Sequence, residues 1–359
     1  MFNFFQKPAF GLDISDYSIE VISLKGSLER PKLLAMGRAI LEPGVVEDGK
    51  ILQKDKLEVI LKALIEKPKF GRILTKKLIF ALPESKIFLH SFELPEILGK
   101  EKIKKEVELQ ASQNFPFLLE NLYSDFKIKN KEVLLIAVPR DIVKDYLEIF
   151  KKIKIQPVAL EIESLSLARA LIANKKETTL IVDIGARTTN FSIFDESGLR
   201  LSMAIDIAGN KFSQALAEKM DISLSQAENI KKETGLNPEK KEGRVFLILQ
   251  KEIQGIISEI TKIAEYFKEK EQKTFEKIIL AGGSADLPYL AEYLAENLER
   301  PVLVGDPWEK INIEILKKEE YFKEAFKANP VLYSSVIGSA LRGLTKNPEK
   351  SDINLLPKK

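Results

Sequence analysis

Hydrophobic and polar positions along the first part of the chain predict short strands followed by an amphipathic helix. Residues 9–13 and 18–24 are typical of two strands joined by a polar turn at Ser15, Asp16 and Tyr17. A third strand is expected around 33–41. An apolar face recurring at helical spacing predicts a helix over 54–66, and the apolar run at 77–82 predicts a buried strand.

The middle of the chain has a separate pattern. The run from 84 to 156 predicts strand, charged helix, strand, strand and helix, at 87–94, 100–112, 123–128, 133–138 and 141–153. This is about the smallest size of module that folds alone.

The pattern of the first residues then returns in the second half. After a helix around 162–173, a buried strand at 179–185 ends in a polar turn, and 190–194 forms the returning strand. A strand, an aspartate, a turn and a strand thus occur at Asp13 and again at Asp183, which favours two related α/β halves around a shared cleft. The second half continues with helices at 211–220, 224–232 and 246–267 and a strand at 277–280; Gly282 and Gly283 are expected to open a helix through 298.

Composition removes several kinds of chemistry. The chain has 359 residues, 45% hydrophobic and 30% charged, which indicates a folded protein of two or three domains. With no cysteine and one histidine, His90 in an alternating run, it has no disulfide, thiolate site or two-histidine metal motif. The net charge of +3, with mixed signs, argues against direct nucleic-acid binding.

Membrane insertion is not expected either. The longest charge-free stretch, 328–341, has 14 residues, fewer than the roughly 20 that a spanning helix needs. The aromatic N-terminus at 1–8 is read as a strand lead-in, with a peripheral membrane contact as the alternative. We therefore expect a cytoplasmic protein.

The polar turn after Asp183 has the residues of a phosphate site. Gly185 permits a close backbone approach, Thr188 and Thr189 offer hydroxyl donors, and Asp183 is suited to a hydrated Mg²⁺. An ordinary hairpin is the alternative reading. Gly282, Gly283 and Ser284 follow a strand, and at a helix N-terminus they would favour an anion or a nucleotide.

Taken in order, the Asp13 turn, the Asp183 turn and the Gly282–Gly283 loop resemble the ATPase superfamily of actin, Hsp70 and sugar kinases. That resemblance implies an actin-like fold that binds ATP and Mg²⁺ between two halves, with Asp13 and Asp183 holding the metal through water. The nucleotide-binding residues that it implies are Ser15, Asp16, Tyr17, Gly185, Ala186, Arg187, Thr188, Thr189, Asn190, Gly209, Glu228, Lys231, Gly282, Gly283 and Ser284.

Two of these residues come from one helical segment. Residues 227–235 look like the helix of the bacterial actin branch whose glutamate and lysine reach the ribose and adenine, here Glu228 and Lys231. An exposed glutamate–lysine pair three residues apart is the alternative.

Within that superfamily the chain resembles the type IV pilus assembly PilM family, which is related to FtsA. The matching segments cover nearly all of the chain, at 11–14, 160–170, 182–192, 208–212 and 282–283. The resemblance implies subdomain 1A at 1–83, 157–178 and 330–350, an inserted 1C at 84–156, 2A at 179–219 and 274–329, 2B at 220–273, and a tail at 351–359. Glu163 matches the residue that orients the attacking water if ATP is hydrolysed.

The first phosphate loop departs from the family pattern, DIGSSSVKV. Ser15 replaces the glycine, Asp16 and Tyr17 replace small hydroxyl residues, and Glu20 replaces the lysine. The added acidic groups repel a triphosphate unless a metal or an arginine, such as Arg187, compensates. The enzyme class therefore stays open: at most a slow ATPase, with a degenerate structural nucleotide site as the alternative.

The C-terminal tail contains Ile353, Asn354, Leu355, Leu356 and Pro357. This run resembles the cytoplasmic N-terminal peptide of PilN, the membrane partner that docks between 1A and 1C in the PilM family. We therefore hypothesise that the tail occupies that groove, in its own molecule or a neighbour's, and competes with the partner. The alternative is a short tail that simply ends the fold.

The function implied is an actin-like scaffold of type IV pilus assembly that binds ATP and recruits a PilN-like protein, which places it at the inner membrane only through that partner. Self-association stays open. The alternatives are a small-molecule kinase of the same superfamily, which a phosphorylation screen separates, and an FtsA-like division filament protein, which pelleting separates.

Overall fold

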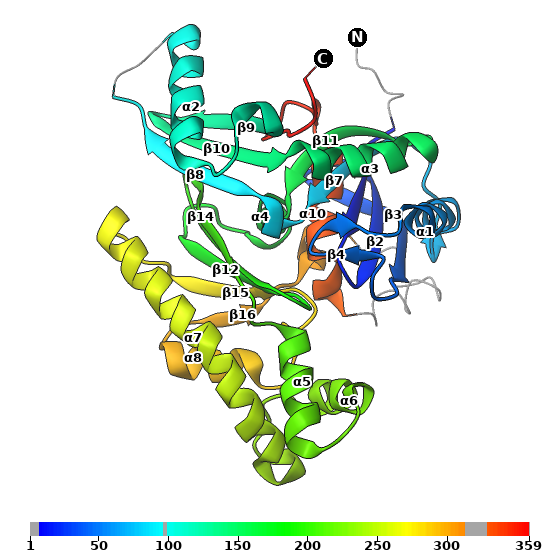
Figure 1. Ribbon diagram of the computed structural model, residues 1–359, viewed down its shortest axis with the longest axis vertical. Coiled ribbons are helices and arrows are strands. Elements are labelled where there is room, and N and C mark those ends of the chain that lie inside the picture. The colour runs from blue at the N-terminus through cyan, green and yellow to red at the C-terminus, as the bar shows by residue number, and fades with distance from the viewer. Residues whose placement is uncertain (1–6, 96–98, 313–328, 359) are drawn as a thin grey trace. The chain divides into compact units, whose positions relative to one another are not determined.

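The computed structural model describes residues 7–95, 99–312 and 329–358 (Figure 1). The chain divides into two compact units. Unit 1 comprises the described residues within 1–170, 307–328 and 335–359, and unit 2 those within 171–306 and 329–334. The aromatic residues 1–6 lie outside the described part.

Unit 1 is built on a six-stranded sheet in the order β11-β7-β1-β2-β3-β6. Its strands are β1 (Phe10–Ile14), β2 (Ser18–Ser27), β3 (Arg30–Ile40), β6 (Phe70–Gly71), β7 (Lys77–Leu82) and β11 (Gln156–Ile162). β1 pairs antiparallel with β2 and parallel with β7. Helix α1 (Lys54–Glu66) buries Leu57, Leu61 and Leu64, and the small hairpin β4 (Val46–Glu47) and β5 (Lys50–Ile51) precedes it.

A second, three-stranded sheet in unit 1 has the order β8-β10-β9. Its strands are β8 (Phe88–Glu93), β9 (Leu122–Lys129) and β10 (Glu132–Pro139), and helix α2 (Lys100–Asn114) contributes Val107 and Ala111 to their core. Helix α3 (Arg140–Lys152) follows β10, and its Tyr146 and Phe150 rings lie 4.7 and 5.3 Å from the Phe80 ring of β7. The apolar face of α3 thus packs on the larger sheet. The subdomain boundaries stay a prediction.

Unit 2 contains a five-stranded sheet in the order β14-β13-β12-β15-β16. The strands are β12 (Thr179–Ile184), β13 (Thr189–Asp195), β14 (Gly198–Ile205), β15 (Lys277–Ala281) and β16 (Val302–Val304). Its main helices are α5 (Gly209–Met220), α6 (Leu224–Thr234), α7 (Arg244–Glu271) and α8 (Leu290–Leu298). Helix α4 (Glu163–Leu171) connects β11 to this unit, and α10 (Ser334–Gly343) returns the chain to unit 1.

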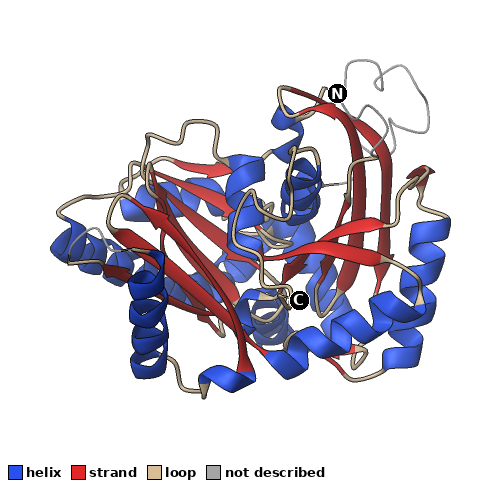
Figure 2. Ribbon diagram, turned by 90° about the horizontal axis from the view of Figure 1, so that it is seen from above, coloured by secondary structure: helices blue, strands red, loops and turns tan. Residues whose placement is uncertain are grey.

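The two larger sheets repeat one topology. In each, three antiparallel strands form a meander, and its first strand pairs in parallel with a later strand: β1 with β7 in unit 1, and β12 with β15 in unit 2. Each sheet ends in a further parallel strand, which is β11 beside β7 in unit 1 and β16 beside β15 in unit 2. Figure 2 shows the strands of each sheet lying side by side with helices around them. The two related halves predicted from the repeated aspartate turn are present.

The sequence prediction of a helix beginning at Gly282 is wrong. Residues 282–289 form successive turns, and α8 begins only at Leu290. Pro288 lacks an N–H and disfavours a helical conformation at the residue before it. Its carbonyl oxygen instead accepts a hydrogen bond from Leu236 N at 2.8 Å, just beyond α6. Gly282 and Gly283 therefore do not stand at a helix N-terminus.

Within the described part of the chain, no helix has the length and apolar character needed to cross a membrane.

Candidate functional site

The turn after Asp183 is joined to the start of helix α5. Gly185 N donates to Thr188 O at 3.0 Å, which closes the turn. Gly209 N and Asn210 N, the first two donors of α5, bond to the carbonyl oxygens of Gly185 and Ala186 at 3.1 and 2.8 Å. The turn is therefore held at the helix N-terminus by backbone bonds.

Gly209 allows three segments of unit 2 to meet. A Cβ at this position would lie 2.6 Å from Ser284 Oγ, 3.2 Å from Gly185 O and 3.4 Å from Lys231 Nζ. Three other segments, namely the second turn, helix α6 and the 282–289 loop, therefore converge on Gly209 at the start of α5.

The buried side chain of Lys231 links helix α6 to the first turn of helix α5. Its side chain is 4% exposed, and its ammonium donates to Gly209 O and Ser213 Oγ, both at 2.8 Å, and pairs with Glu228 at 2.7 Å. Burial lowers the pKa of Lys231, and Glu228 opposes that shift. The exposed-pair alternative is thus wrong for the lysine, because the Lys231 side chain is buried and also donates to Gly209 and Ser213.

Glu228 lies at the edge of the same cluster, with its side chain 36% exposed. Partial burial works against its ionisation, but hydrogen bonds from Lys231, Ser213 and Lys232 outweigh it and bring the pKa of Glu228 to about 2. Glu228 is therefore a charged, partly accessible acceptor.

Gly282 brings its loop against Asp183. It has a φ of +82°, and a Cβ there would overlap Asp183 Oδ1 and lie 2.6 Å from Ile184 O, so both conformation and space require glycine. Gly283 is different, since a Cβ there would meet only Leu332 Cδ2 at 3.6 Å.

Asn190 lies opposite Asp183 in the β12–β13 ladder. Its Oδ1 is buried and has no hydrogen-bond partner among the described residues. A buried acceptor beside a carboxylate suits a hydrated cation, whose water molecules donate hydrogen bonds. Of the other predicted residues in this turn, Arg187 is exposed, Thr188 is half-buried, and Thr189 Oγ1 donates to Ile207 O at 2.6 Å.

In unit 1, the side chains of the first turn bond to the protein itself. Ser15 Oγ accepts the N–H groups of Tyr17 and Ser18 at 3.2 and 3.0 Å. The Asp16 carboxylate accepts Asp48 N at 2.9 Å and Gly49 N at 3.3 Å, which ties the turn to the β4–β5 hairpin. Tyr17 is 49% exposed.

The charge of Glu20 is compensated by a residue that sequence reasoning missed. Arg38 lies opposite Glu20 in the β2–β3 ladder, and its Nε lies 2.6 Å from Glu20 Oε1. Burial still raises the pKa of Glu20, against the opposing effect of Arg38. The sequence had suggested Arg187 for such a role, because strand register is invisible in a linear pattern.

Three predicted carboxylates in unit 1 act on one tyrosine. Burial is the main cause that raises the pKa of Tyr146, followed by the charges of Glu163, Asp16 and Asp13. The Tyr146 hydroxyl donates to Gly49 O at 3.0 Å, and Glu163 accepts Glu84 N at 3.1 Å. The charges of Asp13, Asp16 and Glu163 thus all act on the Tyr146 hydroxyl. No group of three or more metal-ligand side chains occurs within the described residues.

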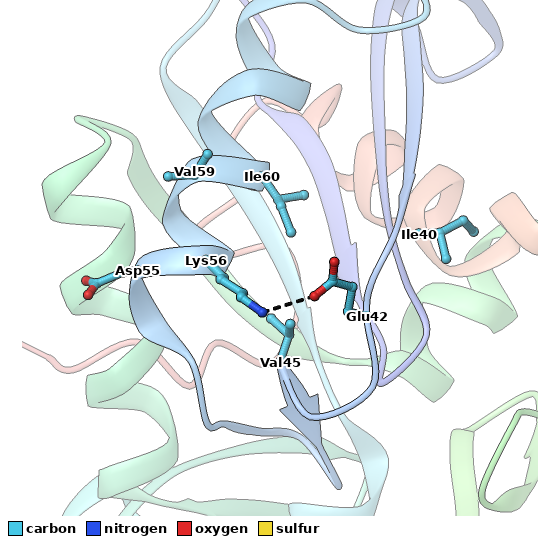
Figure 3. Close-up of a pocket in the computed structure, with 7 residues that line it drawn as sticks. All are labelled: Ile40, Glu42, Val45, Asp55, Lys56, Val59 and Ile60. Carbon is cyan, nitrogen blue, oxygen red and sulfur yellow. Dashed lines mark hydrogen bonds and ion pairs between the residues drawn. The ribbon is translucent and has the colours of Figure 1, made fainter.

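A surface pocket of about 470 Å³ lies elsewhere in unit 1, between α1 and the end of β3 (Figure 3). Ile40 and Val59 are exposed there, and Lys56 pairs with Glu42 at 3.0 Å. None of the residues predicted to bind nucleotide lines it.

Comparison with known proteins gives a family match over most of the chain. The family model described as type IV pilus assembly protein PilM matches residues 11–344.

Solved structures give the same fold. A structure titled "PilM-PilN type IV pilus biogenesis complex" is 20% identical, with a TM-score of 0.79, and the match covers 94% of this chain and 99% of that one. The ethanolamine utilization protein EutJ of Carboxydothermus hydrogenoformans is 16% identical, at a TM-score of 0.55 over 93% and 89% of the two chains. MreB5 of Spiroplasma citri bound to AMPPNP is 15% identical, at 0.52 over 90% and 98%. The actin-like fold predicted from the sequence is confirmed.

Proposed function

Because the chain belongs to the type IV pilus assembly protein PilM family, we propose that it is an actin-like scaffold that binds ATP and recruits the N-terminal peptide of a PilN-like membrane protein. The family match, which spans both aspartate turns, carries this proposal. The converging loops of unit 2 support its nucleotide part.

The nucleotide-binding residues of unit 2 fit a phosphate ligand. Gly209 and Gly282 keep space clear where a side chain would collide with Ser284 or Asp183. Backbone groups of the 185–188 turn and Ser284 would contact phosphate, and Glu228 would accept a ribose hydroxyl. A similar protein of the same fold, MreB5, binds AMPPNP in its solved structure.

Mg²⁺ fits the carboxylate and amide oxygens present. Asp183 and the unsatisfied Oδ1 of Asn190 would accept hydrogen bonds from metal-bound water in unit 2, and Asp13 would do so in unit 1. When bound, the ion would reduce the repulsion between phosphate and nearby carboxylates. Glu163 would orient a water molecule if the nucleotide is hydrolysed.

Lys231 has a positioning role in this proposal. Its ammonium bonds to Gly209 O and Ser213 Oγ and is almost fully buried. It therefore fixes the positions of the first turn of α5 and of the Glu228 carboxylate.

The proposed partner would bring the protein to the membrane. The solved complex that this chain resembles contains PilM and PilN. We therefore propose a cytoplasmic location at the inner membrane, reached through the partner.

Titration of ATP with Mg²⁺ into wild type, Lys231→Met and Lys232→Met tests the nucleotide site. Lys232 pairs with the same Glu228 at 2.9 Å but is exposed, which makes it a matched control. We expect Lys231→Met to weaken ATP binding at least tenfold. Lys232→Met should change the affinity for ATP less than about threefold, because an exposed ion pair contributes little. Failure of the wild type to bind ATP, or equal losses in both variants, would contradict the assignment.

The partner is tested by titrating the cytoplasmic N-terminal peptide of the PilN-like protein. Saturable binding to the wild type is expected, and the absence of binding to any form of the protein would refute recruitment.

A further inference from the structure

Residues 352–358 of the C-terminal tail lie between two edge strands of unit 1. β11 ends the six-stranded sheet and β9 ends the three-stranded sheet. The tail is drawn in red near β11 in Figure 1. Its Ile353 and Leu355 side chains are each 1% exposed, whereas the intervening Asn354 remains partly accessible. Alternate side chains are therefore buried, as in a bound extended peptide.

The contacts with β11 use the free edge of that strand. Leu355 N donates to Leu160 O at 2.9 Å, and Leu160 N donates to Asn354 Oδ1 at 3.1 Å. Asn354 Nδ2 also donates to Val158 O at 3.3 Å. The Asn354 amide thus supplies an acceptor and a donor in the way that a peptide group of an added strand would. An asparagine between two aliphatic residues is the feature that this edge recognises.

The contacts with β9 are made by charged side chains on one face of the strand. Asp125 accepts Asn354 N and Lys358 Nζ, both at 2.9 Å. Lys127, two residues along and hence on the same face, pairs with Asp352 at 3.0 Å. β9 therefore fixes the direction of the segment, with an acidic residue before the asparagine and a basic residue after it.

None of these contacts requires the segment to belong to the same chain. The edge of β11 is bonded through backbone groups and one amide, and the buried positions of Ile353 and Leu355 hold aliphatic side chains. We propose that β11 and β9 form a binding site for an extended aliphatic–Asn–aliphatic peptide, that the tail fills it in cis, and that the tail competes there with the PilN-like peptide. The identity of the competing peptide rests on the proposed function.

The fraction of molecules in which the tail occupies the site follows from its covalent attachment to the same chain. A short tether gives the tail an effective concentration of about 1 mM. If the free peptide binds with a Kd of about 10 μM, the tail occupies the site in about 99 of 100 molecules, so its removal should strengthen binding in trans about 100-fold.

The test is a fluorescence titration with a labelled peptide of residues 351–359. It uses wild type, a truncation after Ser351, Asn354→Ala and the control Asn347→Ala, whose side chain is exposed. The truncated protein should bind about 100-fold more tightly than wild type, because the tail is gone. Asn354→Ala should bind at least tenfold more tightly than wild type, because two bonds to β11 are lost in cis, and Asn347→Ala should match wild type.

Equal affinities of wild type and truncated protein, or no binding to the truncated protein, would overturn the proposal. The full-length variants decide the matter if the truncated chain does not fold, since identical binding by Asn354→Ala and Asn347→Ala would also overturn it.

The same titrations with the PilN-like peptide separate this inference from the proposed function. Tight binding of the tail peptide to the truncated protein, with no binding of the PilN-like peptide to any form, would retain the peptide site and refute recruitment. Equal binding of the PilN-like peptide to wild type and truncated protein would retain recruitment and refute competition by the tail.

Discussion

Replacing Glu161 by glutamine should destabilise unit 1 strongly, because this carboxylate neutralises the buried Arg342 and the half-buried Arg169. Glu161 and Arg342 are both 0% exposed. Arg169 bonds to both carboxylate oxygens of Glu161, at 2.9 and 2.8 Å, and Arg342 Nη1 donates to Oε2 at 2.8 Å. Asp352 lies 3.6 Å from Arg169, so two carboxylates balance two guanidinium groups.

The expected loss of folding free energy in Glu161→Gln is about 3 kcal/mol. Burial opposes ionisation of Glu161, but the two arginines outweigh it and bring its pKa to about 2, from an ordinary value of 4.5. That difference corresponds to roughly 3 kcal/mol of folding free energy at neutral pH. Removing one member of a buried ion pair costs about 3–5 kcal/mol, so the two estimates agree.

The pH dependence has a definite sign. The folded-state pKa of Glu161 is lowered, so its stabilisation is complete above the unfolded pKa near 4.5 and is lost as the pH falls toward 2. The stability difference between wild type and Glu161→Gln should therefore be largest at pH 7 and shrink between pH 4.5 and 2.

Urea unfolding followed by tryptophan fluorescence provides the assay. Trp308, the single tryptophan of the chain, is buried in unit 1 and reports on the unit that contains Glu161. At about 2–3 kcal/mol per molar of urea, the midpoint should fall by about 1 M at pH 7. Glu66→Gln, at an exposed position on α1, is the control and should not move the midpoint. A midpoint shared by both variants, or a difference that stays constant from pH 7 to 3, would refute the reasoning.

Two further predictions concern Gly282, which lies beside the second aspartate turn, and the Glu20–Arg38 pair in unit 1. Gly282→Ala should destabilise the β12 region by about 2 kcal/mol, since alanine must adopt a positive φ and collide with Asp183, and should speed amide exchange of β12 about 30-fold; Gly283→Ala should change exchange little. Equal exchange in the two variants would contradict this account. Arg38→Met should lower the Trp308-detected stability by about 2–3 kcal/mol at pH 7, because it leaves Glu20 buried without its cation. Burial raises the pKa of Glu20, so the variant should recover stability as the pH falls from 7 to 5, and a loss that does not change with pH would contradict the pairing.

Local pattern was sufficient for most elements of the fold. Strands β1, β7 and β12 are mostly apolar, and β2 carries apolar residues at four of its first seven positions, so their positions follow from sequence alone. Strand β14 is mostly half-buried and carries no such run, and β16 has three residues, so neither was predicted. Helix α8 was placed too early because the turn-forming effect of Pro288 depends partly on its bond to Leu236 in another segment.

The sequence by itself determined the repeated strand, aspartate and turn units, because these depend on residues close to one another along the chain. Only tertiary structure decided which charged and polar groups are paired. Glu20 meets Arg38 through strand register, Glu161 meets Arg342 from 181 positions away, and Asn354 meets Leu160 from 194. Such pairs depend on which surfaces are buried together, and burial is what makes an unpaired charge or amide costly. The resemblance of residues 353–357 to a partner peptide suggested that the tail docks, but its contacts with β11 and β9 depend on two sheet edges that no linear pattern displays.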